Sequence, residues 1–265
     1  MNNIYTQSFL HSREKTPIAI SICSGKGGVG KSFISSNLAY LLSESGAKVL
    51  IFDADSQFPN QHLIMGVEPP VRLSQVYKKN VKVSDAIFQV DKNLFLLADM
   101  PAGGLNNTTD EYALIDVYKK ILLEHDFDFI ILDSPAGATQ RVIESCEIAN
   151  MTIFVITDEP TSLLDAYGLI KILLNYIPVS KMRLLVNNVI DFEDADEMSR
   201  KLNAATMKFL GLEIEALGFV PYDRMVRLSI QKQELLCQIN PNHEVSNALK
   251  RIITAINNDS TVIIS

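Results

Sequence analysis

A short run near the start of the chain has the residue types and spacing to bind a nucleotide polyphosphate. The run Gly25-Lys26-Gly27-Gly28-Val29-Gly30-Lys31-Ser32 satisfies the phosphate-loop pattern G-x-x-x-x-G-K-[ST] and contains a second lysine. Its glycines let backbone N–H groups surround phosphate oxygens, a conformation that side chains would obstruct. Lys31 is placed to reach the β- and γ-phosphates, and the Ser32 hydroxyl to ligate Mg²⁺. The sequence therefore predicts a nucleotide site with Mg²⁺.

The elements that must position this loop are visible on both sides of it. Residues 18–23 form a short apolar run suited to a buried strand. After the loop, apolar residues recur at helical intervals from Phe33 to Leu42, and Gly46 is placed to end that helix. The helix would point the positive end of its dipole at the phosphates.

Apolar runs alternate with helical patterns along the rest of the chain, and residues 54–93 are the longest irregular region. Further strands are expected at 48–53, 94–98, 129–133, 152–157, 182–187 and 214–220, and helices near 110–124, 139–148, 162–175, 195–210, 224–237 and 244–257. This alternation predicts an α/β P-loop NTPase fold, with a mostly parallel twisted sheet covered by helices on both faces. In such sheets the ligand lies at the carboxyl ends of the strands.

Acidic residues stand at those strand ends. Asp133 could hold a water ligand of Mg²⁺ or Ser32, which is the Walker B role, or it could simply cap a turn. Asp53 and Asp55 are two residues apart and would face the same side, where one of them could orient or deprotonate the attacking water. The pattern does not rank the two, and a solvated loop pair is the alternative. Gln57 is a further candidate for orienting water.

Composition narrows the class of protein. With 265 residues, 47% of them hydrophobic, the chain suits one sizeable α/β domain. We expect a polar flexible arm over 1–16, a single domain over 17–257 and a tail over 258–265. The net charge of −7 argues against a general nucleic-acid-coating protein. Three scattered cysteines indicate reduced thiols in a cytoplasmic protein, and no apolar stretch approaches the roughly 18 residues of a membrane span.

Three segments resemble the MinD/ParA family of ATPases, whose Walker A motif is a deviant form with a second lysine. They are the phosphate loop, the stretch Asp53-Ala54-Asp55 with its continuation Asn60-Gln61-His62-Leu63-Ile64-Met65-Gly66, and residues 128–137. The resemblance runs from about residue 17 to residue 255. Within that family, residues 158–171 and 218–233 are most similar to the FlhG/FleN group, which regulates flagellar number.

This resemblance implies an ATP-dependent homodimer with a shared active site and slow Mg²⁺-dependent hydrolysis of ATP to ADP. Lys26 matches the lysine that crosses the dimer interface to the partner's phosphates, and Lys26, Lys31 and Asp55 form the catalytic set, Asp55 handling the water. Ser32, Asp53 and Asp133 form the metal group, the two carboxylates through water. Asn187 would contact the adenine edge, unless its neighbour Asn188 does. The expected nucleotide-binding set is Gly25, Lys26, Gly27, Gly28, Val29, Gly30, Lys31, Ser32, Phe33, Asn187, Pro221, Tyr222 and Asp223.

The resemblance also implies partners. The flagellar regulators carry an amino-terminal D-Q-A-x-x-L segment that stimulates the GTPase FlhF, whereas the nearest run here, residues 6–10, lacks the acid and the spacing. FlhF and flagellar switch or basal-body proteins remain candidate partners. Residues 244–257 form an apolar stripe beside Lys250 and Arg251, which would suit weak contact with the inner membrane surface or packing onto the domain.

Three other functions remain open at this stage. The same ATPase could position the division site, DNA or another cargo. An iron–sulfur carrier would need a pair of cysteines near the dimer axis. A nucleotide-binding adaptor without significant hydrolysis would use the same loop as a structural element.

Overall fold

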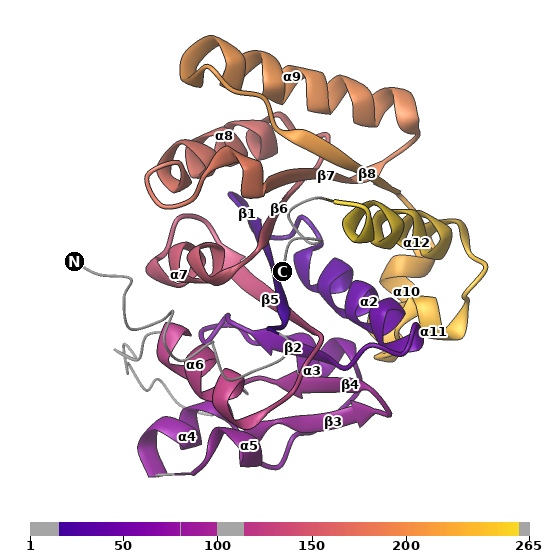
Figure 1. Ribbon diagram of the computed structural model, residues 1–265. Helices are drawn as coiled ribbons and strands as arrows, with labels where there is room; N and C mark the ends of the chain where they lie inside the picture. The colour runs from indigo at the N-terminus through magenta and orange to yellow at the C-terminus, as the bar shows by residue number, and fades with distance from the viewer. Residues whose placement is uncertain (1–15, 80, 100–113, 260–265) are drawn as a thin grey trace.

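A single mixed sheet organises the chain in the computed structural model, which describes residues 16–79, 81–99 and 114–259 (Figure 1). The strand order is β3-β4-β2-β5-β1-β6-β7-β8. The bounds are β1 Ile18–Ser24, β2 Val49–Asp53, β3 Phe88–Asp91, β4 Leu94–Leu97, β5 Phe129–Ala136, β6 Met151–Ile156, β7 Met182–Val189 and β8 Glu215–Pro221. All neighbouring strands pair in parallel except β3 and β4, which are antiparallel. The predicted mostly parallel α/β fold is confirmed.

Helices cover both faces of this sheet (Figure 1). Their bounds are α2 Lys31–Glu44, α3 Gln61–Ile64, α4 Leu73–Lys79, α5 Val83–Ala86, α6 Leu114–Glu124, α7 Gln140–Ile148, α8 Pro160–Leu173, α9 Phe192–Leu210, α10 Arg224–Lys232, α11 Leu236–Ile239 and α12 Glu244–Asn257, with a 3-10 turn at Val179–Lys181. The helices α2, α11 and α12 pack on one face, and α6, α7 and α8 pack on the other.

Alternation along the strands divides the apolar core between the two faces. In β2, Ile51 packs with the α2 and α12 side, whereas Leu50 and Phe52 pack with the α6 side. In β5, Ile131 and Leu132 follow the same alternation. Because both faces of these strands are covered, nearly every residue is apolar, which is why continuous apolar runs predicted the strands.

The region between β2 and β4 departs from expectation. The sequence predicts an irregular segment over 54–93, but the structure forms α3, α4, α5 and β3 there. These elements have four, seven, four and four residues, too short to show a clear periodicity. The strand β3 exists because it pairs with the edge of β4, a long-range partner that its own residues do not reveal.

The helix expected over 224–237 is divided in two. Gln233 has a φ of 59°, a left-handed conformation that ends α10 at Lys232. The chain then starts α11 at Leu236, which is fully buried.

The carboxyl-terminal helix α12 packs onto the domain, which is one of the two arrangements that its apolar stripe allowed. Val245, Leu249, Ile252 and Ile256 are each at most 1% exposed, and they join the core cluster that contains α2. Burial of this side is favoured because it removes four large apolar groups from water. In the described part of the chain, no helix combines the length and hydrophobicity needed to cross a bilayer.

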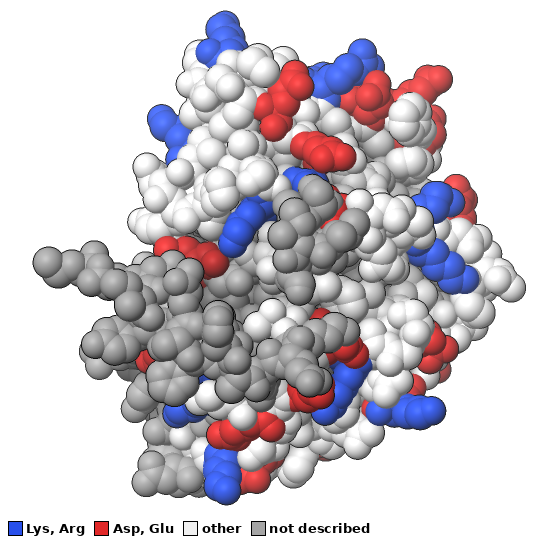
Figure 2. Space-filling view, in the orientation of Figure 1, with Lys and Arg blue, Asp and Glu red and all other residues white. Residues whose placement is uncertain are grey.

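Charge is mixed on the face shown in Figure 2, where basic and acidic side chains are interspersed over the described residues. The described residues of this face therefore form no continuous positive surface that would bind a polyanion such as DNA, which agrees with the net charge of −7. The expected arm over 1–16 and the run at residues 6–10 lie outside the described residues, apart from residue 16.

Candidate functional site

The phosphate loop lies between the end of β1 and the start of α2, and neighbouring elements hold it closely. Gly28 and Gly30 have φ values of 79° and 94°, the left-handed region that glycine tolerates best. A Cβ atom on Gly30 would lie 2.3 Å from Asn187 Nδ2, and one on Gly25 would lie 2.2 Å from the carbonyl oxygen of Asp165. Glycine at these two positions lets neighbouring elements approach the loop closely.

Lys31 starts α2 and is buried beside the loop. Its Nζ donates to Ser24 Oγ at 3.0 Å. Burial lowers the pKa of Lys31, and the charges of Asp133, Cys23 and Asp55 oppose that shift. A buried ammonium group at a helix amino terminus favours a bound anion, because the anion restores the electrostatic stabilisation lost with water.

Two buried carboxylates meet at the ends of adjacent strands. Asp53 of β2 and Asp133 of β5 are register partners, and each is 2% exposed. Burial is the main cause that raises the pKa of both, and for Asp53 the charge of Asp133 adds to it. The Oδ2 of Asp53 accepts the backbone N–H groups of Asn60 and Gln61 at 2.9 and 3.1 Å. Asp133 accepts Ser35 Oγ at 3.0 Å and Gln61 Nε2 at 2.8 Å.

This donor set fits Mg²⁺. Adjacent buried carboxylates repel each other, and a divalent cation would neutralise them. Interaction with the Ser32 hydroxyl lowers the pKa of Asp133, so the predicted metal ligand lies near the Walker B carboxylate. Across the described residues, no cluster of three or more His, Cys, Asp or Glu side chains could hold a metal by itself. Water and phosphate oxygens would complete an Mg²⁺ shell, as is usual for this ion.

Asp55 lies at the edge of this group and is half-buried. Its Oδ1 accepts the backbone N–H groups of Gln57 and Phe58 at 3.2 and 2.9 Å, so the carboxylate shapes the loop that follows β2. The negative charge of Asp55 raises the pKa of Lys31, against the larger lowering effect of burial. Gln57, the other candidate for orienting water, is exposed.

Lys26 makes contacts within its own chain. Its Nζ donates to the carboxylate of Glu159 and, at 3.1 Å, to Thr161 Oγ1 at the start of α8. The side chains of Lys26 and Glu159 are 33% and 59% exposed. An ion pair this exposed contributes little to stability, so Lys26 can leave Glu159 at a small cost in free energy.

The residues expected at the base gather at the ends of β7 and β8. Asn187 Nδ2 donates to the carbonyl oxygen of Val29 at 2.7 Å, whereas Asn188 is exposed with a φ of 64°. Asn187 is therefore the asparagine that contacts the phosphate loop. Pro221 pairs in register with Val189, and Asp223 caps α10 by accepting the backbone N–H of Met225 at 2.7 Å. The side chain of Tyr222 is 63% exposed.

Other residues of the site were not anticipated. Gln61 and Ser35 contact Asp133, and Ser24 contacts Lys31. Ser35 stands one helical turn after Lys31, a spacing that could have indicated it. Phe33 was expected in the nucleotide-binding set, but its side chain is 3% exposed in the core, so only its backbone is available.

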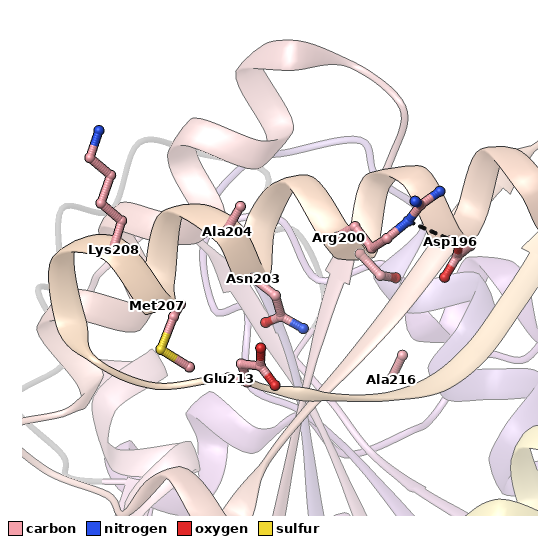
Figure 3. Close-up of a pocket in the computed structure, with 9 residues that line it drawn as sticks. Asp196, Arg200, Asn203, Ala204, Met207, Lys208, Glu213 and Ala216 are labelled. Atoms are coloured by element: carbon pink, nitrogen blue, oxygen red, sulfur yellow. Dashed lines mark ion pairs between the residues drawn. The ribbon is translucent and has the colours of Figure 1, made fainter.

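A separate hollow lies between α9 and β8, away from this group (Figure 3). Asn203, Met207 and Glu213 project into the space below the helix, and the ion pair between Arg200 and Asp196 stands at one side. No residue of the phosphate loop and neither buried carboxylate lines it.

Comparisons with known proteins agree with the P-loop NTPase fold. The family model described as "ParA: NUBPL iron-transfer P-loop NTPase" matches residues 15–257. The antiactivator FleN of Pseudomonas aeruginosa is 29% identical over 238 residues, covering 88% of this chain and 84% of FleN. The flagellum site-determining protein YlxH of Helicobacter pylori is 29% identical over 254 residues, covering 95% and 85%. The septum site-determining protein MinD of Bacillus subtilis is 30% identical over 254 residues, covering 91% and 90%.

A solved structure shares the fold. MinD of Pyrococcus horikoshii in complex with Mg-ADP superposes with a TM-score of 0.77 at 24% identity, covering 92% of this chain and 97% of that one.

Proposed function

The chain belongs to the ParA family of P-loop NTPases, which includes MinD, and from this premise we propose that it is an ATP-dependent switch that dimerises with ATP and regulates flagellar number or placement. The observation that carries the flagellar role is the similarity to FleN and YlxH over most of the chain. The intact phosphate loop and the buried carboxylate pair support the ATPase itself.

The proposed mechanism assigns each step to residues already described. The loop backbone and Lys31 hold the phosphates, with Ser32, Asp53 and Asp133 as the group that would hold Mg²⁺, which supplies charge neutralisation when bound. Lys26 leaves Glu159 and reaches the phosphates of a second copy, where it stabilises developing negative charge. Asp55 then orients the attacking water. Asn187 and the segment 221–223 contact the base.

This assignment uses a dimer to complete each active site, and hydrolysis resets the switch to the monomer. We propose FlhF and components of the flagellar switch or basal body as partners, and we extend to this chain the peripheral association with the inner membrane surface implied by its resemblance to MinD. Since α12 is packed in this structure, such contact would require a different surface or release of that helix.

Positioning of a division site or DNA is the second candidate, favoured by the similarity to MinD of B. subtilis. We favour the ATPase switch over an iron–sulfur carrier because Cys23, Cys146 and Cys237, the three cysteines of the sequence, are all buried. A thiol buried within one chain is not placed to share a cluster with a second chain.

The dimeric active site predicts that specific ATPase activity rises with protein concentration. Each site would lack Lys26 of the second copy in the monomer, so turnover per molecule should be low when the protein is dilute. The measurement is phosphate release in MgATP over a wide range of protein concentrations, with molecular mass determined in parallel. Activity that is independent of concentration would contradict the shared site.

The flagellar role predicts nucleotide-dependent partners. We would use Asp55→Ala as an ATP-locked bait and Lys31→Ala as a nucleotide-free bait, in lysate of the cells that make the protein. Flagellar switch, basal-body or FlhF proteins should be captured only by the locked bait, since partners of a switch distinguish its two states. Capture of division or partition proteins in their place would keep the ATPase and overturn the flagellar role.

A further inference from the structure

Gln61 occupies an unusual place in the site, because it contacts both buried carboxylates at once. Its backbone N–H donates to Asp53 Oδ2 at 3.1 Å, and its side-chain Nε2 donates to Asp133 Oδ2 at 2.8 Å. The same Nε2 donates to the carbonyl oxygen of Ser32 at 3.1 Å. Within residues 16–79, 81–99 and 114–259, no other residue donates hydrogen bonds to both carboxylates through the contacts described above.

The orientation of the amide follows from its neighbours. Both side-chain contacts of Gln61 are with oxygen acceptors, the Ser32 carbonyl and the Asp133 carboxylate. An amide oxygen turned toward them would meet only other acceptors, so the nitrogen must face them. Gln61 is fully buried, and this arrangement leaves its Oε1 buried with no hydrogen-bond partner.

A buried acceptor without a donor is costly, and natural structures keep one only where something compensates. Gln61 Oε1 is therefore available to accept from a donor that arrives with the ligand. A water of an Mg²⁺ shell has the right chemistry, because it donates protons and the ion keeps several waters in such sites.

The position of Gln61 also connects the site to the segment that follows it. Gln61 is the first residue of α3, and Asp53 accepts the N–H groups of both Gln61 and the preceding Asn60. The start of α3 is thus held by one carboxylate through the backbone and by the other through the Gln61 side chain. A change at either carboxylate would be transmitted to α3 through this residue.

We propose that Gln61 is a positioning residue of the Mg²⁺ site, which fixes the two carboxylates for the metal and makes the position of α3 depend on metal loading. The proposal rests on the proposed function, because it assumes that the Asp53 and Asp133 pair serves Mg²⁺ and nucleotide. Gln61 acts through the two carboxylates and takes no part in the chemical step.

The test is the Mg²⁺ dependence of ADP binding, measured with a fluorescent N-methylanthraniloyl ADP. Gln61→Leu keeps a similar volume but removes the side-chain amide that donates to Asp133 and to the Ser32 carbonyl, while the backbone N–H that donates to Asp53 remains. We expect the Mg²⁺ concentration for half-maximal binding to rise by about 10- to 100-fold, the usual effect of losing an outer-shell partner of a metal ligand. Binding of the same ADP in EDTA should be unchanged, because Lys31 and the loop backbone remain.

A matched control and a second variant keep this test decisive. Gln89→Leu makes the same replacement on β3, where Gln89 is exposed, and it should retain the parent's Mg²⁺ midpoint. If Gln61→Leu fails to melt cooperatively, Gln61→Met supplies a more adaptable apolar chain of the same length. A folded Gln61→Leu or Gln61→Met with the parent's midpoint would overturn the proposal.

The Mg²⁺ dependence of ADP binding by the parent protein distinguishes a failure of the role of Gln61 from a failure of the proposed function. If ADP binding by the parent itself does not depend on Mg²⁺, the metal assignment of the Asp53 and Asp133 pair fails, and the role of Gln61 fails with it. If the parent depends on Mg²⁺ and the Gln61 variants depend on it equally, only the role of Gln61 is wrong.

Discussion

Replacement of Asp55 by alanine is expected to lower ATP hydrolysis by about 100- to 10,000-fold, the usual contribution of a positioned acid–base group. ATP binding should persist, because Lys31, Ser32 and the buried carboxylate pair are untouched. The variant should therefore accumulate as a dimer in MgATP. Phosphate release and molecular mass in saturating MgATP measure the two effects separately.

The structure requires a stricter control for this variant, since Asp55 has a second role. Its Oδ1 accepts the N–H groups of Gln57 and Phe58, so alanine also removes the group that shapes this loop. Asp55→Asn retains an oxygen that can accept both hydrogen bonds but is not a base. If Asp55 handles water, both variants lose hydrolysis and both form the dimer.

Two results would count against this assignment. Near-normal turnover by Asp55→Asn would show that Asp55 acts by shaping the loop. An Asp55→Ala protein that stays monomeric in saturating MgATP would show that the residue is needed to assemble the dimer, and its role in handling water would then lack support.

Lys31→Ala should weaken ADP binding by about 100-fold or more, which corresponds to about 3 kcal/mol for the loss of a charge-assisted hydrogen bond. The reason is local, because Lys31 is the buried cation next to the loop and donates to Ser24. Isothermal titration with ADP and Mg²⁺ measures the loss. The matched control is Lys26→Ala, the other lysine of the loop, which should bind ADP normally as a monomer but fail in dimer-dependent hydrolysis.

The stability of the nucleotide-free protein gives Lys31 a second signature. Burial lowers the pKa of Lys31 in the folded protein, because the charged form is less stable there than in the unfolded chain. Below the folded-state pKa the charged side chain therefore reduces the free energy of unfolding, and this destabilisation is lost as the pH rises above that pKa. The Lys31→Ala variant has no buried ammonium group and lacks this destabilisation. From neutral pH toward about 10, the reference value for lysine, the parent should therefore gain more in Tm than the variant. Identical pH dependence, or undiminished ADP binding by the variant, would contradict the role given to Lys31.

The sequence could predict the parts of the site that depend on residues close together in the chain. The glycine and lysine spacing from 25 to 32 indicated the loop, and Asp53 and Asp133 were placed because each follows a continuous apolar run. Strand pairing then brought these carboxylates into register, as the rule for carboxyl ends of parallel strands anticipates. Family resemblance supplied the roles of Lys26 and Asn187, which spacing alone could not assign.

The features that were missed depend on partners far away in the chain. Gln61 matters because its amide meets Asp133, which belongs to a different strand. The strand β3 forms because the edge of β4 is available. For α12 the sequence left two alternatives open, because an amphipathic pattern is the same whether a helix faces lipid or its own core, and the tertiary contacts with α2 and β8 distinguish the two.

The central position of β1 constrains how the protein can be made. Ile18 pairs with Phe129 and Ile20 with Met151, so β1 is synthesised before both of its neighbours and must wait for them. Long-range parallel pairing of this kind slows folding and prolongs exposure of apolar strands. The residues near β7 and β8 that are proposed to contact the base emerge later still. A nucleotide can therefore stabilise the fold only after most of the chain has been made.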